Sequence, residues 1–422
     1  MTRSSTRLVV VGQGYVGLPV AMRAVDVGHT VVGIDLDETR ISSLNAADSY
    51  VDDVADETLA SALASGRYTA TSDYALAEGF TVAVITVPTP LRDSLPDLSF
   101  IERSSEALAP YVTLGATIVL ESTTYPGTTE ELLVPALERG SGLVAGRDFS
   151  VGYSPERIDP GNSVWSFVTT PKVVSGIDAS SLQRVRDFYD TLVETTVPVS
   201  GTREAELTKL LENTFRHVNI ALVNELAIFA HELGVDVWEA IDAASTKPFG
   251  YMRFTPGPGV GGHCLPVDPS YLSWQVRQRL GHSFRFVELA NDVNDHMPDY
   301  VVQRVFALLN EQRRAVNGSR ITIVGLAYKR NTSDVRESPA LRIVELLGQH
   351  GAIVQGVDGH IAEHAWPSGV ERVDLDARTV EMSDLLILVT DHDDLDLELL
   401  QGSTTPVLDT RNRLTGAAVT RL

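Results

Sequence analysis

Short runs of aliphatic and β-branched residues alternate with longer stretches in which apolar residues recur every three or four positions. The runs of the N-terminal half are LVVVG, TVVGID, TVAVITVP, ATIVLES and KVVSGI. Buried parallel strands have this near-continuous apolar character, and amphipathic helices have the longer period. Strands that alternate with helices in this way predict a parallel, doubly wound sheet, so we expect an α/β domain of the Rossmann type.

The alternation stops near residue 200 and returns after residue 318. Residues 202–233 contain neither Gly nor Pro, and a helix of about 32 residues would reach nearly 50 Å. The later runs are RITIVGLAY, AIVQGVDGH, DLLILVTDH and TPVLDTR. We therefore predict a Rossmann domain over residues 1–200, a helical middle domain with a long central helix over residues 201–317, and a second Rossmann-like domain over residues 318–422.

Composition and charge restrict the class of partner. The formal net charge of −22 argues against non-specific binding to nucleic acid, although a small anionic ligand would respond to local charges instead. The apolar run at residues 8–12 is too short for the core of a signal peptide, and no window is long enough to span a bilayer. We expect a cytoplasmic protein with neither a membrane nor a nucleic-acid partner.

The first strand leads into a glycine-rich turn, VVVGQGYVGLP, with Gly12, Gly14 and Gly17 in G-x-G-x-x-G spacing. In this spacing the first glycine permits a tight turn, the second lets a pyrophosphate approach the backbone, and the third lets helix pack on strand. Asp35 ends the second strand, where its carboxylate can accept hydrogen bonds from a ribose diol and would repel a 2′-phosphate. NAD is therefore favoured over NADP. An FAD site, or glycines that serve packing alone, are the alternatives.

The second Rossmann-like half lacks this fingerprint. After RITIVG the chain has Gly325 alone, and the loop that follows carries Lys329, Arg330 and Arg336. Cations at the C-terminal end of a strand suit a phosphate ligand other than a dinucleotide. A solvated charged loop would have the same composition.

The only cysteine, Cys264, lies in the segment PGPGVGGHCLPVDP, residues 256–269. The glycines would let main chain close on a bulky substrate, and the prolines would fix the shape of the loop. A nucleophilic thiol needs donors or cations that lower its pKa, whereas an inert cysteine would be a small buried apolar residue. The segment alone does not decide between the two. His263 is not assigned as the base, and Asp268 is placed to serve a water or a proton.

A second pair of polar residues lies in the long predicted helix. Lys209 and Asn213 of TKLLENTF are four positions apart and so share one helix face. A Lys and an amide on one face can donate hydrogen bonds to an oxyanion formed on a carbonyl. An ordinary exposed Lys beside an Asn is the alternative.

Together the motifs resemble the nucleotide-sugar 6-dehydrogenase family, the relatives of UDP-glucose and GDP-mannose dehydrogenases. The matching segments follow the family's order from residue 8 to residue 412: GQGYVGLP, VPTPL, PDLSF, ESTTYPGTT, SPERIDPGN, AELTKLLENTFRHVNIALVNELA, TKPFG, GPGVGGHCLPVDPSYLSW, GLAYKRNTSDVRESPA and LDTRN. The resemblance implies oxidation of a sugar C6 alcohol to a carboxylate in two hydride transfers, with two NAD⁺ and one water consumed, in an enzyme of polysaccharide biosynthesis.

The resemblance also implies a covalent mechanism. Cys264 would attack the C6 aldehyde to give a thiohemiacetal, and oxidation of this adduct would give a thioester that water cleaves. Lys209 and Asn213 would stabilise the developing oxyanions, and Asp268 would assist Lys209 and water. The residues that would hold the catalytic water are Glu156 and Thr123. No metal is implied.

The family's ligand contacts map onto further positions of this chain. The contacts to NAD would come from Gly12, Gly14, Tyr15, Val16, Gly17, Asp35, Arg40, Thr89, Thr123 and Arg336. The contacts to the UDP-sugar would come from Glu156, Arg157, Lys209, Asn213, Arg253, Gly261, Lys329 and Arg411, so the second Rossmann-like domain would hold UDP. Arg253 has no firm counterpart, and surface charge or a contact in a partner subunit are its alternatives. The central helix would form a homodimer.

The identity of the sugar is the most detailed expectation that the resemblance supports. SPERIDPGN, TKPFG and GGHCLPVDPSYL look most like UDP-N-acetylglucosamine 6-dehydrogenases, with UDP-N-acetylmannosamine enzymes next. UDP-glucose enzymes usually have Ser before the cysteine and an NPEF-like segment, where this chain has GGHC and SPER. Two other classes compete: hydroxyacid dehydrogenases of the 6-phosphogluconate type, which need no cysteine, and a non-catalytic NAD-responsive binding protein. Two, one or no NADH per sugar would distinguish the three.

Overall fold

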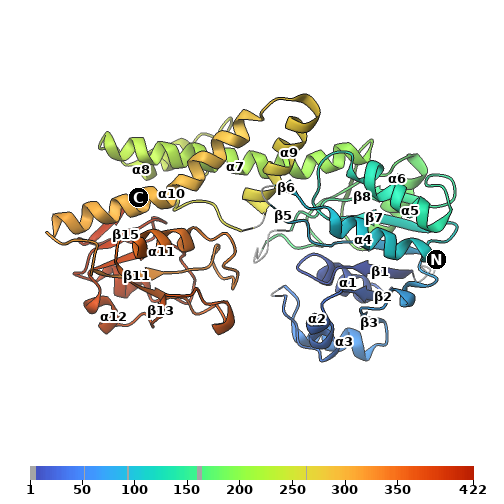
Figure 1. Ribbon diagram of the computed structural model, residues 1–422, viewed down its shortest axis with the longest axis horizontal. Helices are drawn as coiled ribbons and strands as arrows, with labels where there is room; N and C mark the ends of the chain where they lie inside the picture. Colours follow the sequence, from blue (N-terminus) through green and yellow to red (C-terminus); the bar gives the residue numbers. More distant parts are fainter. Residues whose placement is uncertain (1–5, 52, 93–94, 159–163, 263) are drawn as a thin grey trace. The chain divides into compact units, whose positions relative to one another are not determined.

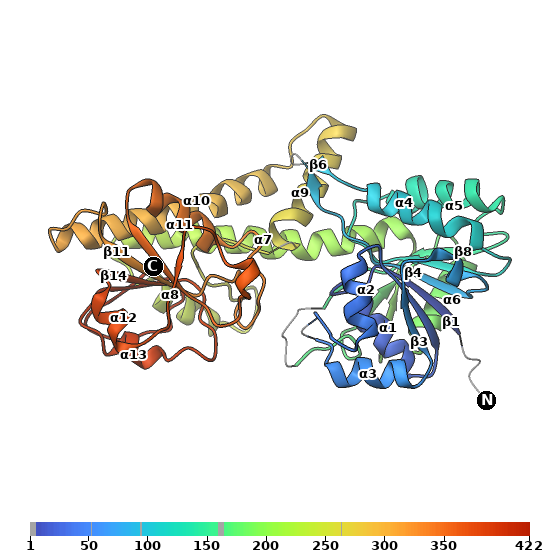
Figure 2. The same ribbon diagram turned by 60° about the horizontal axis from the view of Figure 1, so that its bottom comes forward.

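The computed structural model describes residues 6–51, 53–92, 95–158, 164–262 and 264–422. The chain forms two compact units, Met1–Glu212 and Asn213–Leu422. Each unit contains one large parallel sheet, visible in the two orientations of Figures 1 and 2.

The sheet of the first unit has six strands among the described residues, in the order β3-β2-β1-β4-β7-β8, and all of its pairings are parallel. Its strands are β1 (Arg7–Val11), β2 (Thr30–Ile34), β3 (Tyr68–Thr71), β4 (Val82–Ile85), β7 (Thr117–Leu120) and β8 (Ser150–Tyr153). The central strands are buried along nearly their whole length, which explains why their sequences are continuous apolar runs.

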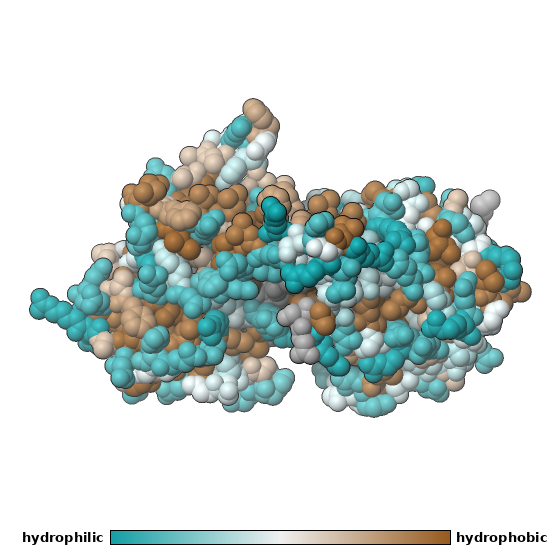
Figure 3. Space-filling view, turned by 45° about the horizontal axis from the view of Figure 1, so that its top comes forward, coloured by the Kyte–Doolittle hydropathy of each residue, from teal (hydrophilic) through white to brown (hydrophobic). Residues whose placement is uncertain are grey.

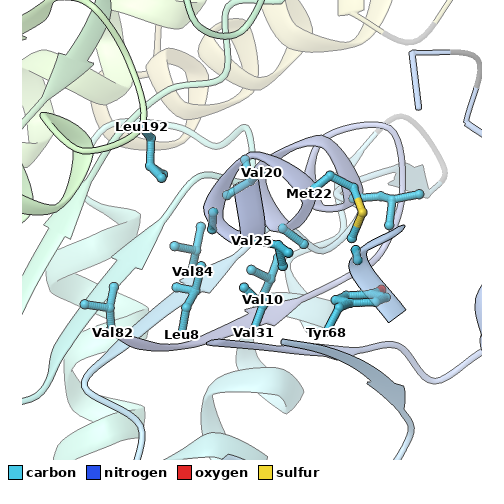
Figure 4. Close-up of a cluster of buried hydrophobic side chains, with 14 of the residues drawn as sticks. Leu8, Val10, Val20, Met22, Val25, Val31, Tyr68, Val82, Val84 and Leu192 are labelled. Atoms are coloured by element: carbon cyan, nitrogen blue, oxygen red, sulfur yellow. The ribbon is translucent and has the colours of Figure 1, made fainter. Parts of the chain in front are cut away.

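Helices connect these strands and bury their apolar faces against the sheet. The helices are α1 (Gly17–Asp26), α2 (Glu38–Asn45), α3 (Asp56–Ala64), α4 (Ser99–Leu108), α5 (Val134–Ser141) and α6 (Ala179–Tyr189), with short turns η1 (Tyr74–Ala77), η2 (Ala109–Tyr111) and η3 (Thr129–Leu133). Figure 4 shows Met22 and Val25 of α1 beside Val10, Val31 and Tyr68 of the sheet, and all five belong to one buried cluster. This packing fixes the start of α1 at the end of β1.

One predicted strand has a different partner. The run KVVSGI forms β9 (Lys172–Val174), which pairs with β10 (Thr196–Pro198) in a two-stranded sheet rather than in the large one. Just after β9, the N–H groups of Ser175 and Ile177 donate to the carbonyls of Tyr153 and Val151 in β8. A short pair, β5 (Leu91–Arg92) and β6 (Leu95–Pro96), completes the strands of this unit among the described residues.

The long helix predicted over residues 202–233 is α7 (Thr202–Glu232), with 31 residues. Gly234 follows it with φ +67, and the N–H of Val235 donates to the carbonyl of Ala230. A left-handed glycine with this backward hydrogen bond is a common helix end, since only glycine adopts it without strain.

The second unit repeats the strand order of the first, β13-β12-β11-β14-β15-β16, again with parallel pairings among the described residues. Its strands are β11 (Arg320–Val324), β12 (Ile353–Val357), β13 (Glu371–Arg372), β14 (Leu385–Leu388), β15 (Val407–Asp409) and β16 (Val419–Arg421). Its helical elements are α8 (Val237–Ser245), α9 (Cys264–Leu280), α10 (Arg285–Glu311), α11 (Pro339–Gln349), η4 (Glu363–Ala365), α12 (Ala377–Met382) and α13 (Leu397–Gln401). The two parallel sheets with a helical middle confirm the predicted fold class.

Among the described residues, none of the helices has both the length and the apolar character that a membrane crossing requires.

Candidate active site

The glycine-rich turn has the geometry that a dinucleotide requires. Gly12 adopts φ +93, and a β-carbon on it would lie 2.7 Å from the carbonyl oxygen of Thr86. A β-carbon on Gly17 would lie 1.8 Å from the carbonyl oxygen of Gly12, whereas Gly14 has no atom within 4 Å of that position. Gly12 and Gly17 therefore serve the turn and the packing of α1, while Gly14 leaves open space beside the backbone, where a pyrophosphate fits.

Asp35 follows β2 directly and is held in place by backbone donors. Its carboxylate accepts the N–H of Gln13 at 2.9 Å and that of Asp37 at 3.0 Å, and the Arg40 guanidinium lies 3.5 Å away. Gln13 was missed in the sequence, although a polar residue between two glycines is a signal. Its buried side chain donates to the carbonyl of Val10 and accepts the Tyr68 hydroxyl, which fixes the turn beneath Asp35.

The other predicted cofactor residues have varied surroundings. Tyr15 is 42% exposed and Val16 is the N-cap of α1, so both flank the open turn. Thr89 is half-buried in the loop after β4. Arg336 belongs to the second unit, where its exposed guanidinium pairs with Asp334.

Glu156 lies just after β8 and is 9% exposed. Its Oε1 accepts the N–H groups of Arg157 at 2.6 Å and Ile158 at 2.5 Å, and its Oε2 lies 3.2 Å from the Lys172 ammonium. The Arg157 guanidinium donates to the carbonyl of Pro171 and pairs with Glu212 of α7 at 2.7 Å. Thr123 is half-buried and follows β7 by three residues.

Lys209 and Asn213 occupy successive turns of α7. Lys209 is only 8% exposed, yet among the described residues its ammonium makes no hydrogen bond or ion pair. A lysine whose side chain is buried while its ammonium is unpaired among the described residues suits a position where an anion is received. Asn213 is 5% exposed and donates from Nδ2 to Oδ2 of Asp268 at 2.6 Å.

Asp268 belongs to α9, one turn after Cys264, which is the first residue of that helix. His263 and the side chain of Cys264 lie outside the described residues. Cys264 therefore begins the same helix that carries Asp268.

The glycines before Cys264 pack against the loop that follows β11. A β-carbon on Gly261 would lie 2.8 Å from the carbonyl oxygen of Glu337, and one on Gly262 would lie 2.5 Å from the Tyr328 ring. Further back, the N–H of Gly257 donates to Oδ1 of buried Asn224 at 2.9 Å. The sequence indicated close approach of this main chain to a bulky substrate, whereas the structure shows close approach to a loop of the same unit.

The remaining predicted substrate residues lie in the second unit. Lys329 is half-buried in the loop after β11. Arg411 follows β15, donates from Nε to the carbonyl of Val389 at 2.6 Å, and its Nη1 lies 3.1 Å from a β-carbon placed on Gly257. Arg253 is exposed and pairs with Asp242 of α8.

One group of three potential metal ligands among the described residues is His360, His392 and Asp394. The Nδ1 of His392 accepts the N–H of Asn331, and its Nε2 faces Oδ2 of Asp358 at 3.0 Å. Both ring nitrogens are therefore engaged within the protein, so this group carries no metal assignment.

A parallel doubly wound sheet that presents this glycine turn and Asp35 defines an NAD-dependent oxidoreductase, and a second such sheet without the turn points to a different nucleotide. Three domain models of one family match in order: the NAD binding domain over residues 6–193, the central domain over residues 203–296 and the UDP binding domain over residues 322–416. The chain belongs to the UDP-glucose/GDP-mannose dehydrogenase family and is an NAD-dependent UDP-sugar dehydrogenase.

Individual relatives support the same assignment. Protein CapL of Staphylococcus aureus is 38% identical over 92% of this chain and 90% of its own length. The UDP-N-acetyl-D-glucosamine 6-dehydrogenase of Pseudomonas aeruginosa is 36% identical over 83% and 82%. The structure of UDP-N-acetylmannosamine dehydrogenase from Pyrococcus horikoshii superposes with a TM-score of 0.89 at 33% identity and covers 98% of both chains. The predicted family, cofactor and enzyme class are confirmed.

Proposed function

We propose that this enzyme oxidises the C6 hydroxymethyl group of a UDP-N-acetylhexosamine, with UDP-N-acetylglucosamine as the preferred substrate. The overall reaction converts one CH₂OH group, two NAD⁺ and one water into one carboxylate, two NADH and three protons. Relatives named for UDP-N-acetylmannosamine and UDP-N-acetylglucosamine share this class of sugar. The SPER and GGHC segments favour the glucosamine form.

The observation that carries this proposal is the buried side chain of Lys209, whose ammonium makes no hydrogen bond or ion pair among the described residues. Oxidation of an alcohol, addition of a thiol to an aldehyde and hydrolysis of a thioester all build negative charge on the oxygen at C6. A donor already in place stabilises that charge without reorganising water. Asn213 shares the helix face of Lys209 and is oriented by Asp268, so together they supply two donors for one oxygen.

The covalent steps fall to Cys264. Its sulfur adds to the aldehyde carbon, a C–S bond forms, and the carbonyl oxygen takes a proton. NAD, when bound, supplies the hydride acceptor for both oxidations. After the second oxidation the adduct is a thioester, water adds to its carbonyl carbon, the C–S bond breaks, and the acid and the thiol are released. Glu156 and Thr123 hold that water.

The binding roles divide between the two Rossmann-type sheets. The turn with Gly12, Gly14, Tyr15, Val16 and Gly17 receives the pyrophosphate, and the further proposed NAD contacts are Asp35, Arg40, Thr89, Thr123 and Arg336. Lys329 and Arg411 neutralise the diphosphate of UDP, while Glu156, Arg157, Arg253 and Gly261 contact the sugar. The Arg253 role is supported least, because its guanidinium is exposed and paired with Asp242.

The helix α7 supports a homodimer. Figure 3 shows apolar patches on the molecular surface, and α7 exposes large apolar side chains at intervals of three, four or seven residues. They are Leu207, Leu211, Phe215, Leu222, Leu226, Phe229 and Leu233. Such a stripe on a helix is the pattern of a surface that another helix covers. Light scattering should give twice the mass of the chain, and Leu222→Glu with Leu226→Glu should give the monomer mass.

A substrate panel tests the reaction directly. UDP-N-acetylglucosamine, UDP-N-acetylmannosamine, UDP-glucose and the galacto isomers are each followed by NADH absorbance. We expect the highest kcat/KM with UDP-N-acetylglucosamine and two NADH per sugar. A higher value for another sugar would overturn the substrate, and one NADH per sugar would overturn the four-electron reaction.

The role of the thiol has its own test. Cys264→Ser should abolish formation of the uronic acid and leave NAD binding near the wild-type value, because the cofactor turn is untouched. Full turnover by this variant would exclude the covalent mechanism.

A further inference from the structure

A buried ion cluster adjoins Glu156. Lys172, the first residue of β9, is 3% exposed. Its Nζ lies 3.1 Å from Oε1 of Glu121 and 3.2 Å from Oε2 of Glu156, and it donates to the carbonyl of Pro155 at 3.2 Å. Glu121 is 1% exposed and follows β7 directly. Three strands thus bring one cation and two carboxylates together beneath the surface.

The charges of this cluster do not cancel. The remaining titratable group that faces it is Tyr189 of α6, whose hydroxyl donates to Oε1 of Glu121. Burial and the neighbouring carboxylates raise the pKa of Tyr189 well above its usual value, so the phenol is neutral. Burial likewise raises the pKa of Glu121, although Lys172 opposes that effect. Oε2 of Glu121 has no hydrogen-bond partner among the described residues. Lys172 is therefore the single cation shared by two carboxylates in this part of the described structure.

The three donors to Glu156 determine the direction of its carboxylate. The N–H groups of Arg157 and Ile158 both reach Oε1, and the ammonium of Lys172 reaches Oε2. A carboxylate offers about four lone-pair positions, so one position on Oε2 remains to accept a further donor. A protonated Glu156 would present a hydroxyl there instead and would lose this acceptor.

We propose that Lys172 is a positioning residue that holds Glu156 as an oriented carboxylate for the hydrolytic water, and that Glu121 anchors Lys172 from the opposite side. This inference rests on the proposed role of Glu156 in thioester hydrolysis. Without the ammonium, two carboxylates would share a buried space with no described counter-ion, and one of them would take up a proton.

Lys172→Met tests the inference, because it removes the charge and keeps a similar length. In rapid mixing with UDP-N-acetylglucosamine and NAD, we expect this variant to give a burst of two NADH per active subunit, followed by steady turnover about 100-fold slower than that of wild type at pH 7. The acid limb of the kcat profile should move to higher pH, because the cation that favours the charged form of the neighbouring carboxylates is gone. Lys172→Arg should restore most of the rate, since it returns the cation.

Glu121→Gln should move the acid limb in the opposite direction. It removes the competing negative charge and leaves Lys172 to Glu156 alone, so turnover should stay within about threefold of wild type. In addition, Lys172→Met combined with Glu156→Gln should be no slower than Glu156→Gln, because Lys172 acts through Glu156. Independent, additive losses would overturn the inference.

A matched control separates positioning from stability. Arg304 is a buried cation of α10 that donates to the carbonyl of Arg421, and Arg304→Met should lower the melting temperature without moving the pH profile. A Lys172→Met enzyme with the same pH profile as wild type would exclude the positioning role. Where Lys172→Met does not fold, Lys172→Arg and Glu121→Gln carry the same comparison of pH profiles. A wild-type enzyme that forms only one NADH per sugar would instead remove the proposed reaction itself.

Discussion

The two Rossmann-type sheets use the same first glycine and then diverge. Gly12 and Gly325 have φ values of +93 and +82, and their N–H groups donate to the last residue of the neighbouring strand, Ile34 at 2.7 Å and Val357 at 2.8 Å. A β-carbon on Gly325 would lie 2.1 Å from the carbonyl oxygen of Thr390, which parallels the contact of Gly12. This glycine is therefore a requirement of the fold in both sheets and by itself indicates no ligand.

The residues that follow this glycine distinguish the open turn of the first sheet from the closed turn of the second. Where the first sheet has Gly14, the second has Ala327, whose N–H donates to Oδ2 of Asp358 at 2.9 Å. Asp358 stands at the end of β12 as Asp35 does at the end of β2, but it is 3% exposed and also accepts from Leu326 and His392. The aspartate at this position is thus partly exposed beside the open turn in one sheet and buried in the protein interior in the other. The openness of the turn, rather than the strand motif, decides between the two.

The largest expected effect comes from disrupting the packing between the glycine turn and α1. Gly17→Val would place side-chain atoms against the carbonyl of Gly12, where even a β-carbon comes within 1.8 Å. We expect NAD binding to weaken more than 100-fold, measured by titration calorimetry, with UDP binding within threefold of wild type. Gly325→Ala should give the reverse pattern, and equal losses of both ligands in either variant would contradict the division of roles.

A smaller effect should follow from removing the partly exposed aspartate of the first sheet. Asp35→Ala removes a charge-assisted hydrogen bond worth about 2 kcal/mol, which corresponds to about 30-fold weaker NAD binding. Arg40 would remain beside the vacated position, so discrimination against NADP should fall as well. The measurement is the ratio of kcat/KM for the two cofactors, and an unchanged ratio would remove Asp35 from the ribose site.

The buried counterpart should affect stability instead. Burial alone would raise the pKa of Asp358, but hydrogen bonds from His392 and two backbone N–H groups outweigh it and lower the pKa to about 2. The carboxylate thus contributes stability that is present above about pH 4 and is lost as pH falls toward 2, with a magnitude of about 2 kcal/mol. Asp358→Asn should remove this stabilisation at pH 7. The amide would point an N–H group at neighbours that are themselves hydrogen-bond donors. Hydrogen exchange of peptides from residues 320–422 reports the loss, and unchanged protection would contradict it.

The first unit should show the opposite pH dependence. Burial raises the pKa of Glu206 to about 7, against the hydrogen bonds from Gly127 and Thr129. A raised carboxyl pKa gives stability that is present below about pH 4.5 and is lost as pH rises through 7. Glu206→Gln should therefore stabilise this unit at pH 8 by about 1 kcal/mol, since relief of the buried charge is partly offset by the loss of an acceptor. Denaturation at pH 5.5 and pH 8 is the measurement, and an equal pH dependence in both proteins would refute it.

Much of this fold could be read from the sequence because its signals are local. Burial of a strand is visible in its own apolar run, as in β1, β2, β4 and β7. The length of α7 is visible in its uninterrupted sequence without Gly or Pro. The cluster of Lys172, Glu121 and Glu156 could not be found in this way, because its members are 35 and 16 positions apart and meet only when three strands are in place. The pairing of KVVSGI, which meets β10 with its first residues and β8 with its last, could not be predicted for the same reason, since a strand's composition does not specify its neighbour.

The packing of residues 257–262 also limits how the enzyme can diversify. Gly261 and Gly262 have no room for a methyl group beside Glu337 and Tyr328. Substitutions in this stretch should therefore destabilise the fold rather than change which sugar the enzyme prefers. Libraries aimed at new sugars should leave these positions constant and vary the exposed side chains just before them, at Phe249, Tyr251 and Met252.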